Sequence, residues 1–212
     1  MSNRVDTNLS LEYTKSNDVV AGSETYSKGS SMDDEQLVAL IVKTKSSELF
    51  SVVYDRYSEK VYHKCISFVK NKEEAQDLTH DIFVKLFVKI NSFNQKSKFS
   101  TWLYAFTYNH CVNYVQRDLN KRRDKFISNK DENSLEEVYP DIADEEIYTM
   151  DTDRFMKSLA LIEPDDKSIL FMKYQDDMSI EDIQNALVLG KSAVKMRISR
   201  AKSRLIEIYK TV

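Results

Sequence analysis

Glycine and proline are scarce in this sequence. Three of the 212 residues are glycine, two are proline, and the stretch from Ser30 to Leu189 contains no glycine at all. Tight hairpin turns between strands favour glycine at positive φ, so this stretch disfavours β-sheet and favours helices. It also excludes a glycine-rich phosphate-binding loop, and no acid pair or Cys–His pair marks a catalytic cleft. We therefore expect an all-α protein that is not an enzyme.

Long apolar runs and disulfide patterns are also missing. No apolar run reaches about 18 residues and no signal-peptide core is present, so we expect a cytoplasmic protein without membrane insertion. Cys65 and Cys111 are too few for a disulfide framework and are expected to be reduced core thiols. His63 and His110 lie beside them, but near neighbours on a helix point in different directions, which disfavours a zinc site. We expect no metal and no cofactor.

The charge is unevenly distributed along the chain. The formal net charge is only −3, yet residues 131–153 contain ten acids and no base. Residues 183–205 contain six bases and no acid. The average charge therefore says little about nucleic acid, whereas the distribution predicts a nucleic-acid contact near the C-terminus.

The spacing of apolar residues divides the chain into four parts. Residues 1–31 are polar and without period, which is typical of a flexible tail. Residues 32–123 show four helical patterns, and residues 153–212 show three or four shorter ones. Residues 124–152 are acidic, contain Pro140 and lack sustained periodicity, which indicates a linker. The sequence predicts two small helical domains, the second of them a helix-turn-helix domain, joined by an acidic linker.

The C-terminal domain contains the helix-turn-helix pattern. Ser179 is a plausible cap for one short helix and Gly190 for a second, basic one. The second helix of such a pair fits a DNA major groove, and its exposed face carries the candidate DNA contacts: Lys191, Ser192, Ala193, Lys195, Arg197, Ser199, Arg200 and Lys202. A helical hairpin with a solvated basic face is the alternative. Six bases without one acid favour DNA contact, because the signs on a merely soluble face normally alternate.

An aromatic segment precedes the linker. Trp102 and Phe106 are followed by Asn109, Asn113 and Arg117 at helical spacing. Aromatic rings stack on unpaired bases and amides read their edges, so the segment suits a single-stranded nucleic acid. Aromatic residues at helical spacing are more often core, and from this pattern alone that alternative stays open.

Four stretches resemble one known family. Residues 74–86, EAQDLTHDIFVKL, resemble the "EAEDL-x-Q-E-x-F-x-K-L" segment of extracytoplasmic-function sigma factors. Residues 194–201, VKMRISRA, are similar to the family's "VKSRLxRA", and residues 50–62 and 92–109 resemble two further segments. These stretches occur in the family's order, with the linker in the expected place.

The resemblance implies a sigma factor that binds core RNA polymerase, recognises promoter DNA at its −10 and −35 elements, and melts it to initiate transcription. The implied polymerase-binding residues are Glu74, Asp77, Leu78, Asp81, Phe83 and Leu86. The implied −10 contacts are Phe93, Asn94, Lys96, Lys98, Phe99, Trp102, Asn109, Asn113 and Arg117. The helix that starts at Lys191 would read the −35 element. An anti-sigma protein, often membrane-bound in this family, is the expected inhibitor.

The turn between the last two helices departs from the family pattern. Val188 stands where glycine is common, Gly190 where serine or threonine is common, and Gln184 replaces a small residue. A β-branched residue is strained where a turn needs positive φ. Two other functions remain open at this point: a helix-turn-helix regulator that binds duplex DNA without polymerase, and a protein-binding adaptor, which the basic helix disfavours.

Overall fold

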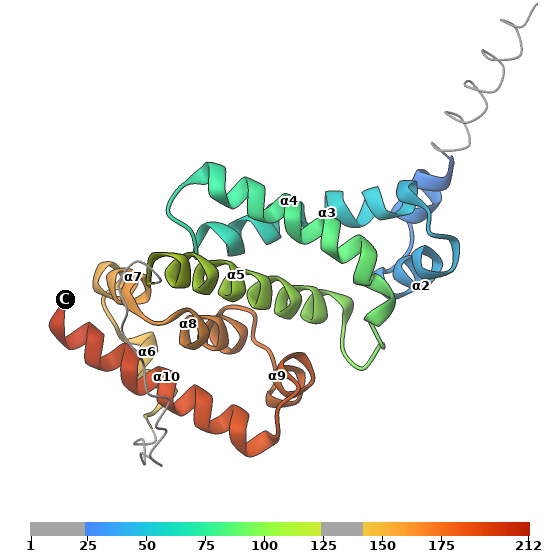
Figure 1. Cartoon of the computed structure of the whole chain (residues 1–212). Coiled ribbons are helices and arrows are strands. Elements are labelled where there is room, and N and C mark those ends of the chain that lie inside the picture. The colour runs from blue at the N-terminus through green and yellow to red at the C-terminus, as the bar shows by residue number, and fades with distance from the viewer. Residues whose placement is uncertain (1–23, 124–141) are drawn as a thin grey trace, which may run out of the picture.

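The computed structural model describes residues 24–123 and 142–212, and those residues form helices and loops without any strand (Figure 1). The expected all-α fold is confirmed. In the described part of the chain, no helix is long and apolar enough to span a bilayer. The labelled elements are α2 (Asp34–Thr44), α3 (Ser47–Ile66), α4 (Lys72–Lys89), η1 (Ile90–Ser92), α5 (Phe99–Arg123), α6 (Asp144–Tyr148), α7 (Thr152–Leu161), α8 (Pro164–Leu170), η2 (Phe171–Gln175), α9 (Ile180–Leu187) and α10 (Lys191–Thr211).

Polar side chains set the starts of the helices. Asp33, Ser46 and Asn71 each accept a hydrogen bond from the backbone N–H three residues further on, at the starts of α2, α3 and α4. Ser179 and the residue at the third position of α9 form a reciprocal capping box, and Gly190 is the N-cap of α10. Each cap satisfies a backbone donor that the helix itself leaves unpaired. The caps predicted at Ser179 and Gly190 are confirmed.

Helices α2 to α5 enclose the first hydrophobic core. Apolar side chains such as Leu37, Val61 and Leu86 are fully buried in it. Cys65 of α3 and Cys111 of α5 lie in the same core with their sulfurs 3.9 Å apart, and both are free thiols. The prediction of buried, reduced cysteines is confirmed.

The second core is built by α7 to α10, and α5 contributes to it as well. Ala105 and Tyr108 of α5 are buried together with residues such as Met172, Ile183 and Val194. Figure 1 shows α5 between α3 and α4 on one side and α8 and α9 on the other. The two helical parts therefore pack directly against each other, with α5 as the shared element.

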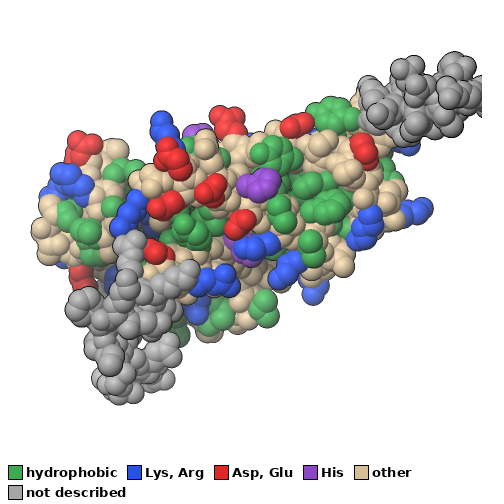
Figure 2. All heavy atoms as spheres, turned by 45° about the horizontal axis from the view of Figure 1, so that its top comes forward, with side chains coloured by type: hydrophobic (Ala, Val, Ile, Leu, Met, Phe, Trp, Pro, Cys, Tyr) green, Lys and Arg blue, Asp and Glu red, His purple; other side chains and the backbone are tan. Residues whose placement is uncertain are grey.

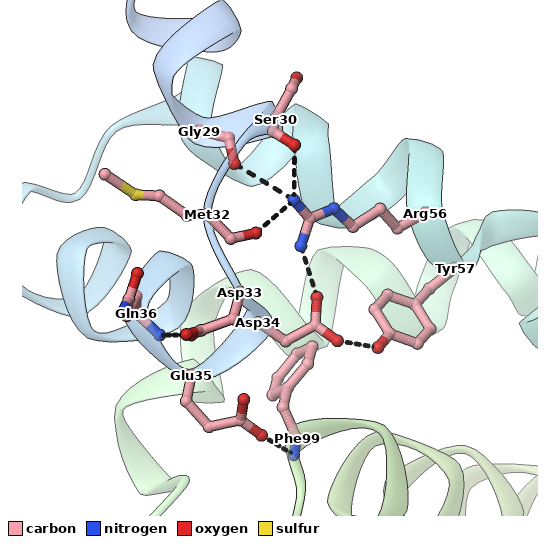
Figure 3. A network of polar contacts seen from close by, with 10 residues as sticks. All are labelled: Gly29, Ser30, Met32, Asp33, Asp34, Glu35, Gln36, Arg56, Tyr57 and Phe99. Carbon is pink, nitrogen blue, oxygen red and sulfur yellow. Dashed lines mark hydrogen bonds and ion pairs between the residues drawn. The ribbon is translucent and has the colours of Figure 1, made fainter.

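The N-terminal part is more ordered than the sequence indicated. Residues 24–30 form a helix, whereas a flexible tail was expected over 1–31. The Arg56 guanidinium explains the difference, because one of its nitrogens donates to the carbonyls of Gly29, Ser30 and Met32 at the end of this helix (Figure 3). Residues 1–23 lie outside the described part of the chain.

The second difference from the expected organisation is α6, a short helix inside the stretch expected to be a linker without regular structure. Its Asp144 carboxylate accepts hydrogen bonds from the Tyr174 hydroxyl at 2.6 Å and the Lys202 ammonium at 2.9 Å. These bonds lower the pKa of Asp144. They fix α6 on α10, so part of the acidic stretch is folded. Residues 124–141 lie outside the described part.

Candidate nucleic-acid interface

Helix α2 fixes the start of α5, the helix that carries the candidate −10 contacts. Glu35 accepts a hydrogen bond from the Phe99 backbone N–H at 3.0 Å, at the first residue of α5 (Figure 3). Next to it, the Asp34 carboxylate pairs with Arg56 at 2.6 Å and accepts a hydrogen bond from the Tyr57 hydroxyl. A carboxylate at a helix N-terminus satisfies a free N–H and matches the helix dipole. The loop before α5 is therefore anchored at its C-terminal end, where α5 begins.

Three aromatic rings pack against one another where this loop meets α5. Phe93, Phe99 and Trp102 have mutual centroid distances of 5.4 to 6.0 Å. Phe99 is completely buried and Phe93 nearly so, while Trp102 is half-buried. This conformation therefore contradicts the prediction that Phe93 and Phe99 contact DNA directly, because their buried rings do not present a surface to a base. Both rings belong to the first hydrophobic core.

The exposed polar residues of this region form a stripe on α5 and a second group in the loop before it. Asn109, Asn113 and Arg117 follow one another at intervals of four on α5, and all three side chains are exposed. The loop adds three further exposed residues: Asn94, Lys96 and Lys98. Amide donors and acceptors together with cations suit the base edges and phosphates of an unpaired strand.

His110 extends the aromatic row along α5, a feature that the sequence analysis did not single out. Phe106 stacks on Trp102 with centroids 5.5 Å apart, and His110 contacts Phe106 edge-on at 4.4 Å. Burial lowers the pKa of His110 to about 4, and three nearby cations contribute, namely Lys85, Lys89 and Arg117. The imidazole is therefore neutral near pH 7 and acts as one more ring at the edge of the stripe.

The start of α10 presents its basic face to solvent. Lys191, Ser192, Lys195 and Arg197 are exposed, and Ala193, Ser199 and Arg200 are half-buried. Lys202 is different. It is 6% exposed and donates to Asp144 and to the backbone carbonyl of Ile142. This conformation contradicts the predicted DNA contact of Lys202, because its ammonium group is already hydrogen-bonded to α6 and to the residue two positions before it.

The turn before α10 contains the strain that the sequence indicated. Val188 has φ 55° and ψ 45°, in the left-handed region, and its side chain is 89% exposed. A left-handed conformation costs a β-branched residue about 1 to 2 kcal/mol, while glycine adopts it freely. An exposed side chain contributes little packing to offset this cost.

Val188→Gly should therefore raise the free energy of unfolding by about 1 kcal/mol, after the larger entropy of the unfolded glycine chain is subtracted. Urea unfolding followed by circular dichroism measures the shift. Val88→Gly is the matched control. Val88 is 70% exposed inside α4, so the same substitution should lower stability there by about 0.5 kcal/mol, the difference in helix propensity between valine and glycine. Equal losses at both positions would contradict the strain at Val188.

The outer face of α4 carries the candidate polymerase contacts. Asp77 and Asp81 are exposed and Glu74 is half-buried. Val84 and Val88 continue the same stripe with 54% and 70% exposure, and Figure 2 shows acidic and hydrophobic side chains side by side on the face that includes α3 and α4. The other three predicted contacts are buried in the first core and have no surface for a partner: Leu78, Phe83 and Leu86.

Comparison with known proteins identifies both halves of this arrangement. Residues 53–122 match the model of sigma-70 region 2, and residues 152–205 match that of sigma-70 region 4. The two matches lie in one chain, in this order, over the two helical parts. The chain belongs to the sigma-70 family. Its relatives place it in the extracytoplasmic-function group.

Similar proteins agree with this assignment over most of the chain. The extracytoplasmic-function sigma factor SigW of Bacillus subtilis is 25% identical over 77% of this chain and 90% of its own. The sigma-H factor of Pseudomonas aeruginosa is 24% identical over 81% of this chain and 91% of its own. Among solved structures, the sigma factor RpoE of Bartonella quintana, determined in complex with the anti-sigma factor NepR, has the same fold. It gives a TM-score of 0.53 at 21% identity over 76% of this chain and 96% of its own.

Proposed function

We propose that this sigma factor binds core RNA polymerase through the outer face of α4, holds the melted −10 element on α5 and reads the −35 element with the start of α10. One observation carries the proposal. The sigma-70 region 2 and region 4 matches cover the two helical parts, and each part exposes a stripe with the chemistry that its role needs. The proposal assigns no catalytic step to the chain itself.

The −35 element is assigned to the first two turns of α10. Lys191, Ser192, Lys195 and Arg197 are exposed there and can reach base edges or phosphates, with Arg200 at the flank. A recognition helix contacts base edges with its N-terminal residues, and the exposed residues of α10 are concentrated at that end.

The −10 element is assigned to the stripe on α5 and the loop before it. The amides of Asn109 and Asn113 can hydrogen-bond unpaired bases, and Arg117 can neutralise a phosphate. The loop residues Asn94, Lys96 and Lys98 would surround a base that leaves the stack. Trp102 then supports the loop from behind.

The polymerase-binding surface is assigned to Glu74, Asp77 and Asp81, together with the exposed Val84 and Val88. Acidic side chains beside exposed apolar ones suit a basic partner surface that also buries hydrophobic area. The valines take the place of the three buried residues that the family pattern suggested. We also infer a cytoplasmic location, since core polymerase is there, and an anti-sigma partner, since a structural relative carries one in its solved complex.

Run-off transcription tests the proposal. Purified protein and bacterial core polymerase are incubated with a pool of promoter fragments from the source genome, and transcripts are sequenced. We expect initiation from a defined subset of the fragments, and none with core polymerase alone. The sequences of that subset also give the promoter sequence. No complex with core, combined with tight binding of the free protein to duplex DNA, would favour the helix-turn-helix regulator instead.

A further inference from the structure

A buried ionic cluster joins the two helical parts. The Lys64 ammonium of α3 lies 2.5 Å from one carboxylate oxygen of Asp176, which follows η2. The Tyr108 hydroxyl of α5 donates to the other carboxylate oxygen at 2.7 Å and lies 3.1 Å from the Lys64 nitrogen. One cation, one anion and one hydroxyl from the two parts thus satisfy one another.

The cluster is shielded from water. The Lys64 and Asp176 side chains are 6% and 8% exposed, and Tyr108 is fully buried. Burial lowers the pKa of Lys64, and the hydrogen bond and charge of Asp176 oppose that effect. The ammonium also lies 4.1 Å from the centre of the Tyr104 ring. Among the described residues, Asp176 of the other part is the anionic partner of Lys64 within salt-bridge distance, and removal of one partner leaves a buried charge unpaired.

Further contacts between the two parts surround the cluster. Lys167 of α8 donates to the backbone carbonyl of Ser67 at 2.6 Å, and the rings of Phe68 and Phe171 meet edge-on at 5.9 Å. Polar contacts on the same boundary include one between Gln116 and Asp165 at 2.5 Å. Hydrogen bonds, ring packing and a buried ion pair together define one arrangement of the two parts, which we name the closed arrangement.

The closed arrangement brings the two DNA-contacting surfaces too close together for a promoter. One cavity of about 580 Å³ is lined by Asn94, Lys96 and Trp102 on one side and by Val188 and Leu189 of the helix-turn-helix turn on the other. The −10 and −35 elements are centred about 25 base pairs apart, or about 85 Å of B-form DNA at 3.4 Å per pair. Because the candidate −10 residues share one cavity with Leu189, two residues before the first −35 residue, Lys191, the two surfaces lie too close together to contact both elements at once.

We propose that the Lys64–Tyr108–Asp176 cluster is a latch that keeps the free sigma factor in the closed arrangement until polymerase separates its two DNA-binding parts. This inference rests on the proposed function, because only a promoter-spanning role requires the parts to separate. In the open arrangement Lys64 and Asp176 are both solvated. Opening therefore leaves no buried charge without a partner. The cluster stabilises the closed arrangement only while both Lys64 and Asp176 are present.

Distance measurements on the full-length protein test the latch. Fluorophores are attached to Lys43→Cys and Lys210→Cys, two exposed sites in different parts, while the native cysteines stay buried. Asp176→Asn should raise the ratio of open to closed molecules at least about tenfold and lengthen the measured distance. Its association with core polymerase should become faster by a similar factor. Asp177→Asn is the matched control, since it makes the same charge change at an exposed neighbour.

The second variant is Lys64→Met, which removes the cation and keeps an apolar side chain of similar length. If the pair acts as one unit, the effects of the two substitutions are not additive. The double variant Lys64→Met with Asp176→Asn should then shift the ratio of open to closed molecules by less than the sum of the two single effects. Distances in Asp176→Asn and Lys64→Met identical to those of Asp177→Asn would overturn the latch, even if the wild type initiates transcription. A wild type that never initiates with core, while Asp176→Asn still opens, would instead overturn the proposed function.

Discussion

A sigma factor with Asn109→Ala and Asn113→Ala should bind core polymerase normally but open promoters about 100-fold more slowly, since each lost base contact is worth about 1 to 3 kcal/mol. Both side chains are exposed on α5, so their removal leaves no cavity. Alanine also has a higher helix propensity than asparagine, so α5 itself should be no less stable. A defect would therefore belong to strand opening and not to folding.

Fluorescence of 2-aminopurine placed in the −10 element follows the opening rate, and native gels measure the affinity for core. The double variant Gln36→Ala and Gln76→Ala, which removes two exposed amides from other helices, serves as the control and should open promoters at the wild-type rate. Wild-type opening by the Asn109 and Asn113 variant would remove the role assigned to these amides. Loss of core binding in that variant would instead show that these residues of α5 contact the polymerase.

Local features of the fold could be predicted from the sequence because local interactions determine them. Ser179 and Gly190 were recognised as caps, since a cap needs only a suitable residue next to an apolar pattern. The strained turn at Val188 followed from the missing glycine in the same way. The helix over residues 24–30 escaped prediction because it is held by Arg56, which is distant in the sequence.

The division of the site residues into core and surface could be predicted only in part. A family pattern shows that Phe99, Leu78 and Lys202 belong to functional segments, yet it does not say which face of the helix each one occupies. The structure buries all three and exposes Asn109 and Val84 instead. Burial depends on the neighbouring helices, and a single sequence does not define how those helices pack.

One half of the proposed latch leaves a signal in the sequence. Lys64 follows Tyr57 and Val61 at three-and-four spacing, so a cation stands on the buried face of α3. A buried lysine requires a partner. The partner, Asp176, is more than one hundred residues away, and nothing local to either residue relates them. The sequence could therefore have predicted a buried pair, although not its location between the two parts.

Charge reversal on α4 should have the second large effect. Asp77→Lys with Asp81→Lys is expected to weaken binding to core polymerase about 100-fold, because close charge pairs across an interface contribute about 1.5 to 7 kcal/mol and reversal turns attraction into repulsion. Both aspartates are exposed and lie on the stripe that continues with the valines. Binding to isolated −35 duplex should be unchanged, since α10 belongs to the other part.

Titration of labelled protein with core polymerase at two salt concentrations measures the loss, which should shrink at high salt as charges are screened. Glu59→Lys with Glu207→Lys is the matched control: it changes the net charge from −3 to +1, as the test variant does, at exposed positions on α3 and α10. Equal weakening in both variants would show a general charge effect. Weakening in the α4 variant alone assigns the acidic side of the interface to Asp77 and Asp81. The valines then form its apolar side, and Val84→Ser with Val88→Ser should weaken binding without any dependence on salt.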